Sequence, residues 1–366
     1  MTALDGYFRG RGVAMLDIAP GVATPARFTS AADEHLATRR ACGLFDFSFM
    51  VCVEIRGRQS LVFLHRLQTR HLARLAPGRI AYTLMLREDG TVLNDATVWC
   101  FAVDHYALFT GRRDDLAHVH EVARGFEVTL SHRAGDHTVI AVQGVRAWPA
   151  LAHCIAGAPA DLPYFGFWWA SFQGQPCWIA RIGYSGEAGY EIIVNAAQAS
   201  ALWDALREAG TPMGLAECGF DAVNSLRVEA GHVLFNAELA TAVTPRALGL
   251  LRLVDIYAYD FIGKSGLSLP SKTTPEIRLV GLIHLHHAKL SDATEAQTLI
   301  GDDPMSGVRI TSACYSPLFQ CVLALGFVRA QDAAPGTRMR LVQGASVTVA
   351  RLPFYDPAKH LARRTR

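Results

Sequence analysis

The sequence lacks the cysteine patterns that mark disulfide frameworks and structural metal sites. Its 8 cysteines are scattered over 366 residues, with no C-x-x-C pair and no clustering with histidine at metal-ligand spacing. Scattered cysteines of this kind are typical of reduced thiols in the core of a cytoplasmic protein. We therefore expect no disulfide framework and no bound metal.

The sequence also lacks an excess of charge and a long apolar run. It holds 35 basic and 33 acidic residues, a balance that favours neither nucleic acid nor an anionic membrane as the partner. No uninterrupted apolar run approaches the ~18 residues of a membrane span, and no basic region followed by an apolar core opens the chain. These absences predict a cytoplasmic protein with a small-molecule partner.

What the sequence has is length and apolar content, 51% of its residues being hydrophobic. A chain of this length is long for one core, so two or three domains are expected. Short β-type runs near the C-terminus, at 278–285, 308–312, 322–329 and 345–352, predict a small all-β domain there. A linker is expected at 268–275, where prolines and small polar residues gather.

The most informative stretch is Arg181–Val194, which reads R-I-G-Y-S-G-E-A-G-Y-E-I-I-V. Apolar runs flank a turn-rich middle, a pattern that predicts two strands joined by a short loop. Glu191 lies inside the second strand, on the face of Ile193 and opposite Tyr190, Ile192 and Val194. Its carboxylate is therefore either solvated or buried with donors from a planar ligand that presents adjacent N–H groups.

Three acids near the N-terminal end of the chain have structural interpretations. Ser30 is expected to cap a helix, with Asp33 three residues on. Glu34 and His35 are then expected on a solvated face of that helix. Asp46 is expected to cap a turn rather than to act as a base.

The stretch G-Y-S-G-E-A-G-Y-E-I resembles the G-Y-T-G-E-x-G-Y-E-I signature of the glycine-cleavage T-protein (aminomethyltransferase) family. Further segments resemble that family in the same order, over residues 28–356. Among them are Phe28–Met50, with E-H-x-A-x-R and F-D-x-S, and Gly219–Gly231, with L-R-V-E-A-G. The resemblance implies an α+β fold of three domains arranged as a cloverleaf, with a C-terminal β-barrel-like domain.

The implied domains are discontinuous. Residues 1–50 with 138–245 would form a folate-binding α+β domain, and 51–137 with 246–273 a second α+β domain. Residues 274–366 would form the C-terminal all-β domain. Tetrahydrofolate is the implied cofactor, bound in the central opening.

The resemblance also implies the site residues. Glu191 corresponds to the glutamate that holds the amino-pyrimidine edge of the pterin, and Tyr82, Tyr184 and Arg227 are the further cofactor-binding candidates. For Arg227 an ion pair or a capping role is the competing interpretation. The catalytic candidates come from the stretch V-L-N-D-A, where the family has a pair of aspartates. Asn94 replaces the first of them, taken as the catalytic one, and Asp95 keeps the second.

The replacement at Asn94 decides the predicted reaction. Aminomethyl transfer forms bonds to two folate nitrogens and benefits from a nearby carboxylate, whereas methyl transfer forms one bond and depends more on positioning. Because an amide cannot carry negative charge, we expect methyl transfer from a small S-, O- or N-methyl donor to tetrahydrofolate. Loss of the family arginine at Val223 favours the same reaction.

Three alternatives stay open, one of them a degenerate member of the family with no activity. The first is the family's aminomethyl transfer in glycine cleavage, with a lipoyl carrier protein as partner and Asp95 in compensation. The second is a non-catalytic folate-binding relative. The signature of such relatives puts a cysteine where this chain has Gly183 and a glutamine where it has Glu187, which argues against that branch.

Overall fold

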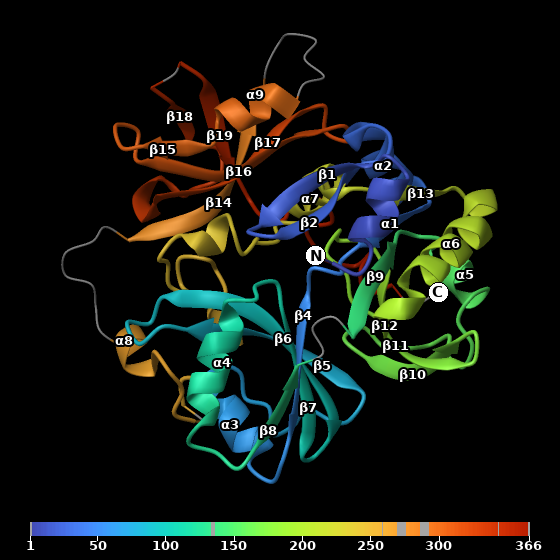
Figure 1. Cartoon of the computed structure of the whole chain (residues 1–366). Helices are drawn as coiled ribbons and strands as arrows, with labels where there is room; N and C mark the ends of the chain where they lie inside the picture. The colour runs from blue at the N-terminus through green and yellow to red at the C-terminus, as the bar shows by residue number, and fades with distance from the viewer. Residues whose placement is uncertain are drawn as a thin grey trace.

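The computed structural model shows three lobes arranged around a common centre (Figure 1). It describes residues 2–132, 136–257, 259–268, 276–285, 293–342 and 344–364. Nearly all of the linker expected at 268–275 lies outside these ranges. In the described part of the chain, no helix is long and apolar enough to cross a membrane.

The first lobe is a six-stranded sheet with helices packed against it. Its strands, in spatial order, are β10 (Phe167–Phe172), β11 (Gln175–Ala180), β12 (Gly189–Asn195), β9 (His137–Gln143), β3 (Cys42–Asp46) and β13 (Leu215–Cys218). Its helices are α2 (Ala31–Arg40), α5 (Ala147–Ala152), α6 (Ala199–Gly210) and α7 (Phe220–Glu229). A short helix, α1 (Asp5–Gly10), and the hairpin of β1 (Ala14–Ala19) and β2 (Val22–Arg27) precede it.

The second lobe is a five-stranded antiparallel sheet. Its strands, in spatial order, are β5 (Arg79–Leu86), β6 (Val92–Ala102), β7 (His105–Thr110), β4 (Val51–Arg56) and β8 (Thr129–His132). The helices α3 (Ser60–Leu67) and α4 (Asp115–Ala123) belong to this part of the chain. Asp89 and Gly90 close the β5–β6 hairpin, with Gly90 at φ 82°, in the left-handed region that glycine adopts without strain.

The third lobe is a second six-stranded sheet. In spatial order its strands are β15 (Gly301–Asp303), β16 (Val308–Ser316), β17 (Cys321–Arg329), β14 (Ile277–His284), β19 (Ser346–Ala350) and β18 (Arg338–Arg340). Two short helices, α8 (Lys264–Ser268) and α9 (Ala293–Thr298), precede and follow β14 along the chain. The expected α+β fold of three lobes, with a β domain at the C-terminal end, is confirmed.

The chain passes through the lobes discontinuously. Strand β3 belongs to the first sheet, the next strands up to β8 form the second, and β9 returns to the first. Strand β9 begins at His137, one residue before the boundary expected at 138. The domain boundaries themselves stay a prediction.

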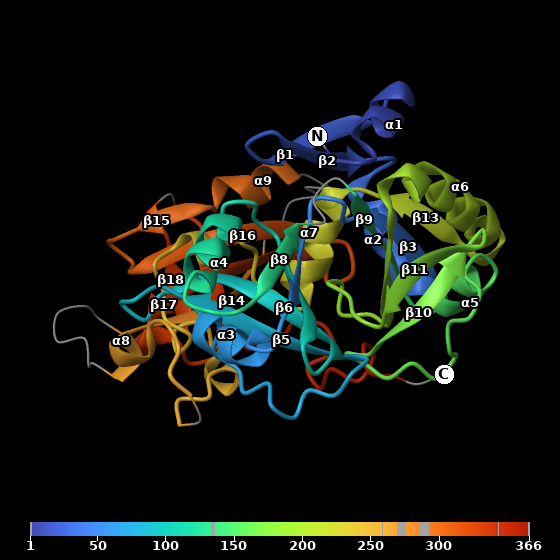
Figure 2. The same ribbon diagram turned by 60° about the horizontal axis from the view of Figure 1, so that its bottom comes forward.

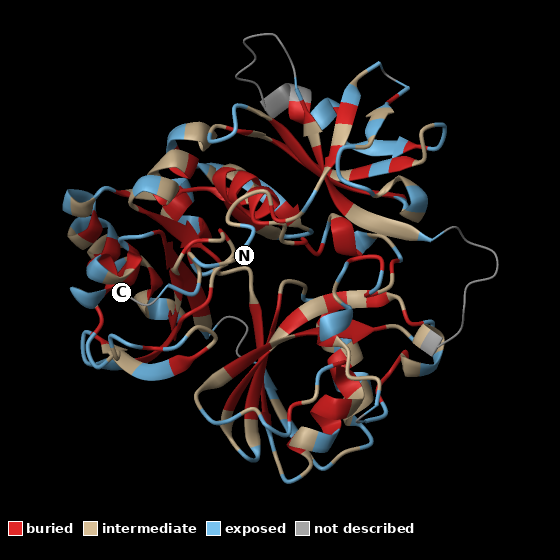
Figure 3. Ribbon diagram, turned by 180° about the vertical axis from the view of Figure 1, so that it is seen from behind, coloured by how far each residue is buried: buried red, intermediate tan, exposed pale blue. Residues whose placement is uncertain are grey.

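The centre of the molecule is a shared apolar core. It combines side chains from the first sheet, such as Ala141 and Trp178, with Trp99 and Phe109 of the second sheet and Leu226 of α7. Figure 3 shows the inner faces of the lobes and α7 as mostly buried, with exposed residues at the periphery. The two α+β lobes and α7 therefore meet in one apolar interior, and any site at the centre is desolvated by it.

Local expectations near α2 are met in part. Ser30 caps the helix by accepting a 3.1 Å bond from the backbone N–H of Asp33, as expected. The solvated face expected for Glu34 and His35 is wrong, because both side chains are buried. Glu34 accepts from the backbone N–H groups of Thr29 and Gly219, at 2.7 Å each, so it satisfies donors at two chain segments.

Candidate functional site

Glu191 lies in the middle of β12, as the sequence predicts. Ile192 packs in the core of the first lobe, whereas Ile193, on the face of Glu191, belongs to the central core. The cross-strand neighbours of Glu191 are Ala180 on β11 and Ala141 on β9. The residues opposite Glu191 on both neighbouring strands are therefore small.

The carboxylate of Glu191 is desolvated and unpaired. Burial raises its pKa to about 7. Within the described ranges no hydrogen-bond donor or cation binds it. A half-buried carboxylate that keeps no protein partner costs stability, and this cost is removed when a ligand supplies the donors.

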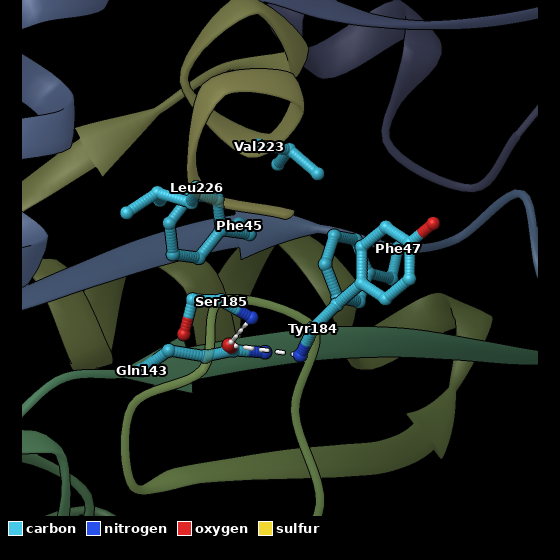
Figure 4. Close-up of a pocket in the computed structure, with 7 residues that line it drawn as sticks. All are labelled: Phe45, Phe47, Gln143, Tyr184, Ser185, Val223 and Leu226. Carbon is cyan, nitrogen blue, oxygen red and sulfur yellow. Dashed lines mark hydrogen bonds between the residues drawn. The ribbon is translucent and has the colours of Figure 1, made fainter. Parts of the chain in front are cut away.

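A tightly packed pocket lies between β3, the end of β9, the loop that precedes β12, and α7 (Figure 4). Its walls are mostly apolar, and its lining consists of Phe45, Phe47, Gln143, Tyr184, Ser185, Val223 and Leu226. Asp46, between the two phenylalanines, accepts a 2.9 Å bond from the backbone N–H of Ser48, so it closes a turn as expected. Aromatic walls of this kind suit a flat heterocycle.

Gln143 anchors the loop that precedes Glu191. Its Oε1 accepts from the backbone N–H groups of Tyr184 and Ser185, at 3.1 and 3.0 Å, as Figure 4 shows. Its Nε2 is buried without a partner. A side chain at Gly183 would be too close, since a Cβ there would lie 2.8 Å from Oε1 of Gln143. The Gln143 amide would have to shift to admit a side chain at position 183, and one of its N–H groups is unused at the pocket.

A buried charge network fixes the other side of the same loop. Arg39 of α2 donates to Oε1 of Glu187 at 2.8 Å and to the carbonyl of Ser185 at 2.9 Å. It also donates to Oε2 of Glu229 at 2.7 Å, and its guanidinium lies 3.8 Å from the ring centroid of Tyr355. Arg39 thereby ties the loop to α7 and to the C-terminal segment.

Tyr82 and Asp95 form a hydrogen-bonded pair on the second sheet. The phenol of Tyr82 on β5 donates to Oδ2 of Asp95 on β6 at 2.8 Å. Burial raises the pKa of Asp95 to about 6, and the bond from Tyr82 opposes that rise. On the same face of β6, Trp99 packs in the central core. The Asp95 carboxylate therefore faces the centre of the molecule, as Glu191 does.

Asn94 lies on the opposite face of β6 and is completely buried. Its Nδ2 donates to Oγ1 of Thr110 at 3.0 Å and to Oδ2 of Asp115 at 2.6 Å. Ala96, two residues along the same face, belongs to the separate core of the second lobe. The structure thus separates the two catalytic candidates, and Asn94 lies away from the centre.

Tyr184 lies where the two sheets approach each other. Burial raises the pKa of its phenol, Arg227 opposes the rise, and the nearby charge of Asp95 adds to it. The hydroxyl donates to the carbonyl of Val233, and the ring stacks on His232 with 5.5 Å between centroids. Tyr184 is therefore anchored by Val233 and His232, close enough to Asp95 for the two charges to interact.

Arg227 is buried on α7, with every one of its N–H groups engaged by protein. It donates to Oε2 of Glu238 at 2.8 Å, to the carbonyl of His232 at 3.1 Å and to Oγ of Ser312. Its remaining donors bind Oδ1 of Asn224 at 3.0 and 2.7 Å. The structure therefore gives Arg227 the ion-pairing role and joins α7 to β16 of the third lobe.

The pocket residues fit a folate. The unused Nε2 of Gln143 is a donor without a protein partner, and Phe45 and Phe47 supply an aromatic wall. Glu191 does not line this pocket; it adds an acceptor on β12, the strand next to β9. Sequence reasoning missed Gln143, Phe45 and Phe47. Phe45 and Phe47 could have been found, because they flank Asp46 in the F-D-x-S segment that resembles the family. No sequence pattern showed that Gln143 faces the loop of Tyr184 and Ser185.

Comparisons with known proteins agree with this geometry. The family "GCVT N-terminal domain" matches residues 6–257, and "Glycine cleavage T-protein C-terminal barrel domain" matches residues 278–356. An aminomethyltransferase of Streptomyces avermitilis is 35% identical over 345 residues, covering 92% of this chain and 91% of its own length. One from Desulfitobacterium hafniense is 31% identical over 360 residues and covers 97% of both chains.

A solved structure is also similar. The crystal structure of glycine cleavage system aminomethyltransferase T from Bartonella henselae superposes with a TM-score of 0.83 at 25% identity, covering 97% of this chain and 98% of that one. Fold and site define a folate-dependent transferase. The chain belongs to the glycine cleavage T-protein (aminomethyltransferase) family, whose one-carbon acceptor is tetrahydrofolate.

Proposed function

We propose that the protein is an aminomethyltransferase that acts on an aminomethyl-loaded lipoyl carrier protein and tetrahydrofolate. One observation carries the proposal: the carboxylate of Asp95, held by Tyr82, faces the same central core as Glu191. The carboxylate whose loss at Asn94 suggested methyl transfer is therefore available from the neighbouring residue. The named aminomethyltransferases among the relatives support the same reaction.

Asp95 is the proposed catalytic residue. With a pKa of about 6, most of the Asp95 carboxylate is ionised at neutral pH. This pKa is also near enough to neutral pH for the carboxylate to accept a proton during the reaction. Bound tetrahydrofolate supplies the two nitrogens that receive the one-carbon unit. A carboxylate in a desolvated centre stabilises positive charge that develops nearby, and the Tyr82 hydroxyl fixes its orientation.

Glu191 and Gln143 are the proposed recognition residues. Glu191 would accept paired N–H bonds from the pterin edge, and Gln143 would donate from the Nε2 that has no protein partner. Tyr184 would position the ring from its anchored place beside His232. Arg227 would act indirectly, as the residue that holds α7 against the third lobe.

A second candidate is methyl transfer from a small donor to tetrahydrofolate. Val223 favours this reaction. It lines the pocket at the position where the family pattern has arginine, so the cation that would contact the aminomethyl donor is absent at that position. A non-catalytic role has less support. The signature of that branch has a cysteine where this chain has Gly183.

Identification of the folate product separates the candidates. Purified protein is incubated with tetrahydrofolate and either an aminomethyl-loaded lipoyl carrier protein or a panel of methylated donors. The proposal predicts methylene-tetrahydrofolate and ammonia in the first reaction only. Formation of 5-methyltetrahydrofolate from a methylated donor, with no product from the carrier, would select methyl transfer instead.

A further inference from the structure

The second lobe carries a pair of histidines outside the proposed folate site. His120 lies on α4 and His132 is the last residue of β8, and the Nε2 atoms of the two rings face each other in direct contact. The ring centroids are 4.6 Å apart, with 46° between the ring planes. Figure 2 shows α4 and β8 next to each other in this lobe. The two imidazoles therefore converge through the same ring nitrogen.

The contact between the two Nε2 atoms is weak as a hydrogen bond. A neutral imidazole has one N–H and one lone pair, so one ring must donate its Nε2–H to the other. Burial lowers the pKa of His132 and the nearby charge of His120 lowers it further, so a second proton between the rings is disfavoured. Both residues are exposed, so water competes with the bond. The pair therefore gains little from the contact by itself.

A divalent transition metal ion satisfies both nitrogens at once. Neutral imidazole is a common ligand of Zn²⁺, Ni²⁺ and Cu²⁺, and each ring can keep its own proton on Nδ1. An ion at about 2.0–2.1 Å from each nitrogen places the two nitrogens about 3–4 Å apart, which small rotations of two exposed side chains supply. In the described part of the chain no group of three or more histidine, cysteine or acidic ligands is present. Water would therefore complete the coordination.

The position of the pair gives such an ion a structural role. Strand β8 is an edge strand that pairs with β4, and three of its four residues are exposed. Helix α4 is fixed at its first residue, where Asp115 accepts from Asn94 at 2.6 Å, whereas His120 contacts β8 from the second half of the helix. An ion between the two rings would join that half of α4 to the edge strand.

We propose that His120 and His132 bind one divalent transition metal ion of the Zn²⁺, Ni²⁺ and Cu²⁺ class, which holds α4 against β8. The proposal is independent of the folate site, and one-carbon transfer should not depend on the ion. Cu²⁺ should bind more tightly than Ni²⁺ or Zn²⁺, and Mg²⁺ should not bind, because it prefers oxygen ligands. The pair has no sequence signature, since its members are 12 residues apart on different elements.

The test is calorimetric titration of the full, untagged chain with ZnCl₂ and CuCl₂, with MgCl₂ as the control salt. We expect one saturable Zn²⁺ or Cu²⁺ site per chain. His120→Gln and His132→Gln should each weaken binding at least about tenfold, because each removes one of two ligands. His153→Gln is the matched control and should bind as wild type does. It removes an exposed histidine of the first lobe, whose Nδ1 contacts the carbonyl of Pro149 at 2.6 Å.

Thermal unfolding gives a second measurement. Zn²⁺ at about 100 times its Kd should raise the unfolding midpoint of wild type and of His153→Gln by about 3–6 °C. The midpoints of His120→Gln and His132→Gln should rise by less than about 1 °C under the same conditions. In the Cu²⁺-loaded wild type, the electron paramagnetic resonance spectrum should show hyperfine splitting from two imidazole nitrogens.

Three results would overturn the site. Wild-type protein that shows no saturable binding of Zn²⁺ or Cu²⁺ has no such site. Binding that survives in both His120→Gln and His132→Gln means that other side chains hold the ion. Binding that is lost in only one of the two variants means that the rings do not share an ion.

Discussion

Asn94 and Asp95 are consecutive residues of β6, and their side chains lie on opposite faces of the strand. Asn94 donates at 2.6 Å to Asp115 in the interior of the second lobe, whereas Asp95 accepts at 2.8 Å from Tyr82 at the centre of the molecule. A strand alternates faces at every residue, so a motif of two adjacent acids places only one of them in a given site. For this chain the one at the centre is Asp95.

Restoring the family's acid at position 94 should damage the protein. Asn94→Asp would put a second carboxylate within hydrogen-bond distance of Asp115, with the single hydroxyl of Thr110 as the donor left for both. Burial already raises the pKa of Asp115. We expect a loss of about 2–4 kcal/mol of unfolding free energy, as for uncompensated buried charge, measured by urea denaturation at pH 8.

The pH dependence checks the cause of that loss. A carboxyl whose folded pKa is raised stabilises the fold below its unfolded pKa and loses this contribution as pH rises through the folded pKa. The Asn94→Asp deficit should therefore be smaller at pH 5 than at pH 8. An equal deficit at both pH values would mean that shape, and not charge, causes it.

Glu191→Gln should separate stability from binding. The raised pKa of about 7 means that ionised Glu191 destabilises the ligand-free fold above that pH. We expect the variant to be about 1 kcal/mol more stable than wild type at pH 8 and little different at pH 5. Its affinity for tetrahydrofolate should fall at least about tenfold, because it loses a charge-assisted pair of bonds.

Glu208→Gln is the matched control for that variant, because Glu208 is exposed on α6. It should change neither stability nor affinity. Unchanged folate affinity in Glu191→Gln would remove Glu191 from the binding site, whatever its effect on stability.

Arg227 should behave as a structural residue. Arg227→Met leaves Glu238 buried without its cation, and we expect a loss of about 3–5 kcal/mol of unfolding free energy. Removing both charges with Arg227→Met/Glu238→Gln should recover part of this loss, a coupling that thermal or urea denaturation measures. If Arg227→Met instead stays as stable as wild type and only folate affinity falls, Arg227 contacts the ligand.

The sequence was most reliable where a local pattern has one geometric consequence. The Asp89–Gly90 hairpin, the Ser30 cap and the strand pair around Glu191 all follow from turn chemistry and period-2 alternation, and each is confirmed. The face of Glu191 was also predictable, because Tyr190, Ile192 and Val194 mark the opposite face as the core of the first lobe.

Tertiary context accounts for the rest. Glu34 and His35 look like solvated helix residues, yet they are buried because α7 and the chain around Gly219 pack over α2. The role of Gln143 depends on the loop of Tyr184 and Ser185, more than forty residues away in sequence. To decide whether Asn94 or Asp95 lies at the site, one must know which face of β6 points to the centre of the molecule. The sequence motif does not contain that information.

The most direct test of the account is the single-turnover rate of ammonia release from an aminomethyl-loaded lipoyl carrier protein in the presence of tetrahydrofolate. Asp95→Asn should lower this rate about 100-fold or more, the usual contribution of a positioned carboxylate, without loss of fold. Asn94→Ser, measured on the folded fraction, should stay within about threefold of wild type, because Asn94 lies away from the centre. A full rate in Asp95→Asn, or the larger loss in Asn94→Ser, would contradict the assignment of Asp95 as the acid of the site.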